Sequence, residues 1–405
     1  MNLLSSYKLN VFSLVLLKIT QLIATILITK ELLDIFSVED YGLIVILSSF
    51  AQLVMIDTGS GEAVKKKILQ STINIGNIIC SGIVVTALLS IIISIFSYFL
   101  FRDVLSDVEV DNVILILLMS SVIMTFKISR EVFSAIHMTF IHSFILSLSI
   151  LFSIYYVYNF QIETVMEAVV VQHGALLVGN ILVFLFMIKR LNLNNFLFKV
   201  DIKGIRSIFP DSFTFFLIGV SLMLINGIDI ILLTSLGLNK KMIAEISLLL
   251  KVSVYIHTFF MFLIYPSWPM LSSIKDNKKN ITNYIMFFVI LFSAILIIIV
   301  GTNLFTLIKM WTNLELKISN YVIWSFLLFT YLRLVSDLFD YVLRANGVLK
   351  YQMYFTPLEA ILHLSLCVFG WHVAGLIGYS VMLPISTFFG RLLPFLFQLK
   401  SNKII

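Results

Sequence analysis

Ionisable side chains interrupt several long apolar stretches of this chain, and they are its main candidates for chemistry. Each costs about 2.5–3.5 kcal/mol at the middle of a membrane helix, so each needs a partner or a watery cavity. Buried cations bind phosphate oxygens through charge-assisted hydrogen bonds, and buried carboxylates bind protons, cations or sugar hydroxyls. The residues are Lys18, Asp57, Lys127, Arg130, Glu131, Asp229, Lys251, Arg333, Asp337, Asp340 and Glu359.

Spacing separates these residues into two groups. Opposite charges four residues apart neutralise each other on one helix face. Three pairs have this spacing: Lys127 with Glu131, Arg333 with Asp337, and Asp340 with Arg344. Lys18, Lys251 and Asp229 have no such partner in their own stretch, so we expect them to face a cavity.

Motifs of soluble catalysis are missing from the sequence. There is no Walker-type glycine loop, HExxH, GxSxG or Cys-x-x-Cys. The histidines (137, 142, 173, 257, 363 and 372) show no metal-ligand spacing with one another or with carboxylates. We therefore expect no metal site, no direct use of ATP and no enzyme of a soluble type. A secondary transporter, a channel or an enzyme acting on a lipid-borne substrate remain.

The composition identifies the elements that must position these residues. The chain has 405 residues, 60% of them hydrophobic and 12% charged, with a mean hydropathy of +1.04. A soluble protein has about 25% charged residues. Because about 20 apolar residues span a bilayer, we predict an all-α polytopic membrane protein. Its twelve spans are 9–33, 41–62, 75–101, 112–137, 140–160, 165–188, 208–236, 242–267, 282–308, 318–344, 351–370 and 373–398.

The basic residues between spans predict the orientation. The tails and the connections after even-numbered spans hold most of the lysines and arginines, including Lys65–Lys67, Lys189 and Arg190. Arg391, near the end of the last span, is grouped with them. The opposite connections are acidic. By the positive-inside rule, both termini lie in the cytoplasm.

A weak internal repeat divides the chain into halves. Aligning Ala135 with Ala345, at the ends of the fourth and tenth spans, gives an offset of 210 residues. This offset places Lys127 opposite Asp337 and Arg130 opposite Asp340. We predict two parallel six-helix halves, 1–200 and 201–405.

Several short motifs lie at the ends of predicted spans. They are Glu39, Tyr41 and Gly42 between the first two spans, Asp57 and Gly59 at the end of the second, Lys65–Lys67 after it, and Leu343, Ala345 and Gly347 at the end of the tenth. These motifs resemble those of the Wzx family of O-antigen and polysaccharide-export flippases, which belongs to the multidrug/oligosaccharidyl-lipid/polysaccharide superfamily. Thr58 stands where the family usually has leucine.

The resemblance implies a V-shaped bundle of two six-helix halves around a central cavity. It also implies a flippase that carries an undecaprenyl-pyrophosphate-linked oligosaccharide, an O-antigen repeat unit, from the cytoplasmic to the periplasmic leaflet by alternating access. On this view Lys18, Lys127, Arg130, Lys251 and Arg333 bind the pyrophosphate. Asp57, Asp229, Asp337 and Asp340 would contact sugars or couple transport to H⁺ or Na⁺, with no other cofactor.

Two other functions fit the same composition. One is a membrane O-antigen polymerase or ligase, although the short acidic outer connections carry few arginines. The other is a multidrug or small-solute antiporter of the same fold, although the mid-membrane cations do not suit cationic drugs. For the flippase we expect the bacterial inner membrane as location, membrane lipid and polymerase or chain-length proteins as partners, and no contact with nucleic acid.

Overall fold

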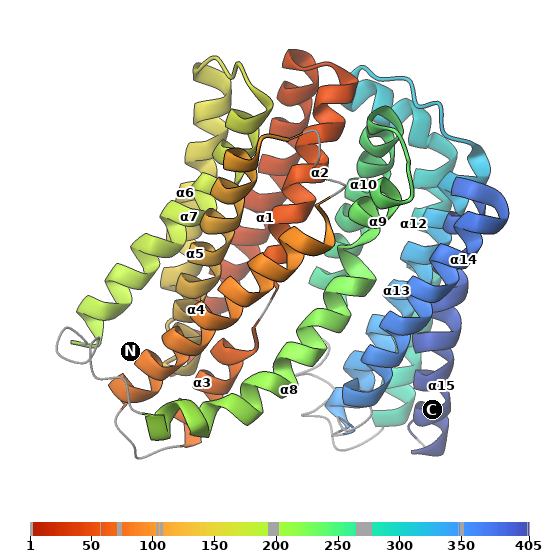
Figure 1. Ribbon diagram of the computed structural model, residues 1–405. Coiled ribbons are helices and arrows are strands. Elements are labelled where there is room, and N and C mark those ends of the chain that lie inside the picture. Colours follow the sequence, from red (N-terminus) through yellow and green to blue (C-terminus); the bar gives the residue numbers. More distant parts are fainter. Residues whose placement is uncertain are drawn as a thin grey trace. The chain divides into compact units, whose positions relative to one another are not determined.

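The computed structural model describes residues 3–56, 58–70, 75–102, 105, 108–192, 202–264, 278–346, 348, 352–402 and 404. All regular secondary structure within these ranges is helical, and Figure 1 shows long helices connected by short segments. The first helices are α1 (Leu3–Ile35), α2 (Val38–Val54), α3 (Ser60–Gln70), α4 (Ile75–Leu100), α5 (Val110–Ala135), α6 (Thr139–Asn159), α7 (Val165–Arg190), α8 (Ile202–Asn226) and α9 (Asp229–Ser235). The later ones are α10 (Lys240–Ile264), α12 (Lys278–Thr312), α13 (Asn320–Ala345), α14 (Gln352–Thr387), the π-helical turn η2 (Phe388–Leu392) and α15 (Leu393–Ser401).

Ten helical segments of the described chain are long and apolar enough to span a membrane. Two features account for the difference from twelve. Helix α2 corresponds to the second predicted span but has only 17 residues. The segment Tyr354–Ser401 contains the last two predicted spans, because non-helical angles at Ala374 and Gly375 divide α14. The prediction of an all-α polytopic membrane protein is confirmed.

The backbone contacts divide the chain into two compact units. Unit 1 comprises Met1–Met223 and Gly227–Lys241, and unit 2 comprises Leu224–Asn226 and Met242–Ile405. The boundary that the sequence suggested, at residues 200–201, precedes α8. In the structure most of α8 and all of α9 belong to unit 1.

Unit 1 is organised around α5, which packs against α3, α4, α6 and α7, while α1 packs along α6. Two short motifs have structural roles here. Tyr41 is fully buried, and Gly42 lies so close to the Lys240 carbonyl that a side chain would overlap it. Gly59 has a φ of +68° and faces the α8 backbone near Ser212. Only glycine adopts this conformation without strain.

Unit 2 has α13 in the corresponding position, packed against α12, α14, η2 and α15. Helices α5 and α13 both have 26 residues, and 210 positions separate both their first and their last residues. Their bounds therefore agree with the offset of the internal repeat. At equivalent positions α5 carries the bases Lys127 and Arg130, and α13 carries the acids Asp337 and Asp340.

The close packing at Gly42 predicts a clear effect of a single methyl group. We expect Gly42→Ala to destabilise the protein by about 1–3 kcal/mol, because the methyl overlaps the Lys240 carbonyl. Thermal unfolding of the purified protein in detergent measures this. The matched control is Gly174→Ala in α7, where a methyl meets nothing within 4 Å. There we expect unchanged or higher stability, since alanine favours helix. Equal losses in both variants would contradict the packing argument.

Candidate functional site

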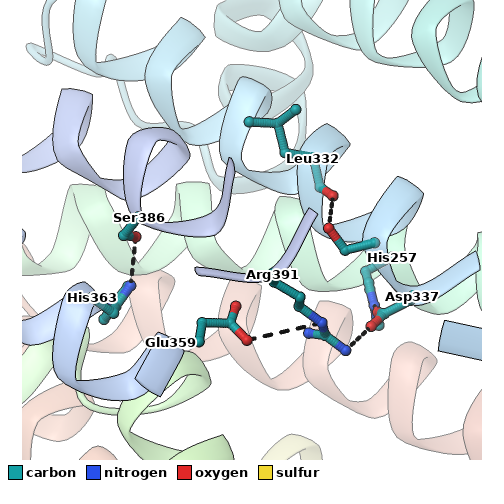
Figure 2. A network of polar contacts seen from close by, with 8 residues as sticks. His257, Leu332, Asp337, Glu359, His363, Ser386 and Arg391 are labelled. Carbon is teal, nitrogen blue, oxygen red and sulfur yellow. Dashed lines mark hydrogen bonds and ion pairs between the residues drawn. The ribbon is translucent and has the colours of Figure 1, made fainter. Parts of the chain in front are cut away.

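A largely buried polar network in unit 2 links His257, Asp337, Arg391 and Glu359 (Figure 2). The Asp337 side chain on α13 is 13% exposed, and both of its oxygens have a partner. The Arg391 Nη2 atom donates to Oδ1 at 2.5 Å, and the His257 Nε2 atom lies 2.6 Å from Oδ2. The network therefore joins α10, α13 and η2 through one carboxylate.

Arg391 reaches this carboxylate from the widened turn η2. The Leu393 N–H bonds to the Phe388 carbonyl, five residues earlier. Pro394 has no N–H to continue α-helical bonding, and its ring crowds the carbonyl four residues before it. A π turn accommodates this local conflict, and such turns are frequent at functional sites.

Glu359 on α14 is the second carboxylate beside Arg391. It is 3% exposed, and its Oε2 atom lies 3.9 Å from the Arg391 Nε atom. Gly390 makes this approach possible, because a side chain at that position would press on Glu359. Arg391 thus lies between two carboxylates, in hydrogen-bond contact with one and at a longer distance from the other.

Further charged groups surround this core. Arg333 acts electrostatically on Asp337 and Glu359, and the buried Asp340 acts on Arg391. On α14, the His363 Nδ1 atom lies 3.3 Å from the Ser386 hydroxyl. Predicted site residues Arg333, Asp337 and Asp340 are thus brought together.

Unit 1 carries a basic patch formed by Lys18 of α1 with Lys127 and Arg130 of α5. Lys127 and Arg130 both act electrostatically on Lys18. Lys18 is exposed, and the Arg130 side chain is 48% exposed, in contrast to 11% for Arg391. An exposed cation within a membrane helix requires water or an anionic partner. The basic patch is therefore suited to an aqueous, anion-binding surface.

A small pocket lies beside the basic patch. Its volume is about 20 Å³, enough for a single water molecule. Lys127, Arg130 and Glu131 contribute to its lining together with hydroxyl groups. Ser60 bonds to Thr58 at 2.7 Å and also to Thr86. The pocket can hold water against the basic patch but is far too small for a sugar.

Glu131 and α3 hold this region together. Lys65 lies 3.2 Å from the Glu131 carboxylate, and Arg130 lies 3.5 Å from it. Lys66 pairs with Asp211 of α8 at 2.8 Å. Lys65 and Lys66, which follow the second predicted span, thus have intramolecular partners.

Other predicted site residues lie apart from these two groups. Asp229 is buried at the first residue of α9 in unit 1. Lys251 lies on α10 in unit 2, on the same helix as His257. Asp57 lies outside the described residues.

One interpretation of the sequence is wrong. Arg391 does not belong to a basic flank: it is buried, because it neutralises carboxylates from α13 and α14. Sequence spacing could not show the contact of His257 with Asp337, because the two residues are 80 positions apart. Spacing pointed to Arg333, which does act electrostatically on Asp337, but it could not show the contacts that His257 and Arg391 make from other helices. Only the charged character of Arg391 within an apolar run hinted at this role.

No protein-family model and no curated protein matches this chain. Among solved structures, the lipid II flippase MurJ in an inward closed conformation matches with a TM-score of 0.65 and 17% identity, over 97% of this chain and 87% of that chain. An inward-facing multidrug resistance MATE family transporter of the MOP superfamily matches with a TM-score of 0.61 and 13% identity, over 96% and 95%. A single-residue mutant of the Vibrio cholerae MATE transporter VcmN matches with a TM-score of 0.55 and 14% identity, over 99% and 97%.

These similarities extend over almost the whole of each chain. The protein therefore has the helical membrane fold of the lipid II flippase and the MATE transporters. At such low identity the likeness concerns the fold. The cargo therefore has to be inferred from the chemistry of this protein's own side chains.

The buried ion pairs predict a large loss of stability when Arg391 is removed. We expect Arg391→Met to cost about 3–5 kcal/mol, because it leaves Asp337 and Glu359 without their cation. Thermal unfolding and the amount of folded protein in the membrane measure this loss. Adding Asp337→Asn to Arg391→Met should restore part of it.

The control is an exposed ion pair of the same unit. Lys309 donates to Glu315 at 2.6 Å, and this contact lowers the pKa of the Glu315 carboxyl. Both side chains are well exposed, so we expect no measurable change in stability from Lys309→Met. A comparable loss of stability in Arg391→Met and Lys309→Met would contradict the view that burial makes the Arg391 ion pairs important.

Proposed function

We propose that this protein is a flippase that moves an undecaprenyl-pyrophosphate-linked oligosaccharide, an O-antigen repeat unit, from the cytoplasmic to the periplasmic leaflet by alternating access. The observation that carries the proposal is the basic patch of Lys18, Lys127 and Arg130 on helices that are otherwise apolar. A fold shared with the lipid II flippase supports it.

The chemistry of the cargo matches this patch. A pyrophosphate with attached sugars cannot cross about 30 Å of hydrocarbon unaided. Exposed lysine and arginine side chains form charge-assisted hydrogen bonds with phosphate oxygens. The water-sized pocket beside the patch leaves the sugars outside it. We assign the pyrophosphate to Lys18, Lys127 and Arg130, and include Lys251 and Arg333 of unit 2 in the binding set.

We also propose a cellular location and a coupling ion that drives transport. The basic connections favour the bacterial inner membrane with both termini in the cytoplasm. We propose H⁺ or Na⁺ as the coupling ion, with Asp57, Asp229, Asp337 and Asp340 as coupling or sugar-contacting residues. Membrane lipid is a partner, and polymerase and chain-length proteins of the same pathway are further partners.

Deleting the gene and locating the lipid-linked oligosaccharide tests the proposed function. Sugars on the periplasmic face are labelled in spheroplasts and compared with the total pool. Units that accumulate on the cytoplasmic leaflet, with no surface glycan, support a flippase. Single units that reach the outer face without long chains indicate a polymerase. An unchanged glycan with altered drug tolerance indicates an antiporter. Either of the last two results overturns the proposal.

The basic patch predicts how neutral variants behave in transport. We expect Lys127→Gln and Lys18→Gln each to weaken cargo binding by about 10- to 100-fold, the effect of losing one charge-assisted hydrogen bond. Uptake of lipid-linked oligosaccharide into proteoliposomes over a range of cargo concentrations measures this. The matched control is Lys30→Gln, which removes an exposed lysine of the same helix α1. The assignment is wrong if all three variants behave alike at equal protein levels.

A further inference from the structure

His257 is placed to take up a proton next to a permanently charged pair. Its side chain is 22% exposed, whereas Asp337 is 13% and Arg391 is 11% exposed. The 2.6 Å contact with the Asp337 carboxylate requires the His257 Nε2 atom to carry hydrogen when Asp337 is ionised. The Nδ1 atom is then the basic nitrogen of the neutral ring. A proton binds there, and the product is an imidazolium whose Nε2–H still donates to Asp337.

The charges around the network favour binding of one positive charge. Arg333 and Arg391 supply two guanidinium groups, and Asp337, Asp340 and Glu359 supply three carboxylates. The titratable groups that also face the network are His257 from α10, Tyr341 from α13 and His363 from α14. When all three carboxyl groups are ionised and both histidines are neutral, these named groups carry one excess negative charge. One proton cancels it, and electroneutrality is the least costly state in an apolar interior.

Two carboxylates lie near Arg391, at unequal distances. It lies at 2.5 Å from Asp337 on α13 and at 3.9 Å from Glu359 on α14. A π turn carries it, and Gly390 brings that turn against Glu359. We propose that His257 is a proton-binding site whose occupancy decides which of the two carboxylates holds Arg391.

The exchange follows from charge balance. Without the proton, Arg391 is the main cation in contact with Asp337. When Nδ1 takes up a proton, the imidazolium neutralises Asp337 through the existing hydrogen bond. Glu359 then stabilises the guanidinium more strongly than Asp337 does, so η2 moves from α13 toward Glu359. Loss of the proton reverses the step, and no other bond forms or breaks.

A proton suits this site better than a metal ion. Within the described part of the chain, no group of three or more His, Cys, Asp and Glu side chains is arranged to hold a metal. Arg391 already occupies the space between the two carboxylates, and its fixed charge repels a second cation. Histidine changes its charge near neutral pH, unlike the arginines beside it.

The first experiment requires no transport substrate. Protein labelled with ¹⁵N at histidine and arginine is purified into nanodiscs, and its spectra are followed over a pH series. The signals absent from His257→Gln and Arg391→Lys identify the two side chains. We expect the His257 signal to change from neutral ring to imidazolium, and the Arg391 guanidinium signal to change in parallel.

Two variants give this experiment its controls. Asp337→Asn should move the His257 transition to lower pH, because the imidazolium loses its negative partner. His372→Gln, which removes an exposed histidine elsewhere on α14, should leave both signals as in the wild type. The proposal fails if the His257 signal does not titrate, if Arg391 does not follow it, or if Asp337→Asn has no effect on the transition.

The link between this proton site and transport rests on the proposed function. In proteoliposomes, a proton gradient should accelerate wild-type and His372→Gln transport of the lipid-linked oligosaccharide. In His257→Gln, rates with and without the gradient should be equal. Retained acceleration in His257→Gln, or acceleration by sodium at constant pH, overturns the coupling. If the wild type moves no oligosaccharide, the proposed function fails, and the spectra still decide whether the proton site exists.

Discussion

The cost of placing charge in an apolar helix bundle is the constraint on which this structure depends. Asp337 illustrates it: the central helix of unit 2 carries a carboxylate that two other helices must neutralise, through Arg391 and His257. The ion pair links α13 to η2, and Glu359 brings α14 to the same arginine. Removing one partner of a buried ion pair costs more stability than the pair contributes, because the remaining charge is left uncompensated. These contacts therefore hold α13, α14 and η2 in one arrangement.

The two units meet this constraint differently. In unit 2 the carboxylates of α13 and α14 are buried, and Arg391 lies between Asp337 and Glu359. In unit 1 the bases at equivalent positions of α5 are partly or well exposed, and Lys18 adds a further exposed positive charge. Buried opposite charges hold helices together, whereas exposed cations among apolar residues need water or an anionic partner. At equivalent positions of the internal repeat, the two units thus carry charges of opposite sign in different surroundings.

Local sequence features make these contacts possible. Pro394 favours the wide turn that carries Arg391, and Gly390 lets this turn approach Glu359. In unit 1, Gly42 and Gly59 allow α2 and the residues before α3 to approach other backbone segments closely. The short motifs that resemble those of Wzx flippases therefore include residues with a direct packing role. Asp57, at the same motif, lies outside the described residues.

The sequence by itself determined the membrane class, the approximate span positions and the repeat register, because each depends on local hydrophobicity and residue spacing. It also identified Asp337, Arg333, Lys127 and Arg130 as residues that need partners or water. Only the tertiary structure decided that Asp337 binds His257 and Arg391, and that α8 and α9 pack with unit 1. Spacing reveals only neighbours on one helix, such as Arg333 and Asp337. The contacts with His257 and Arg391 depend on how helices pack, because packing brings together residues far apart in the chain.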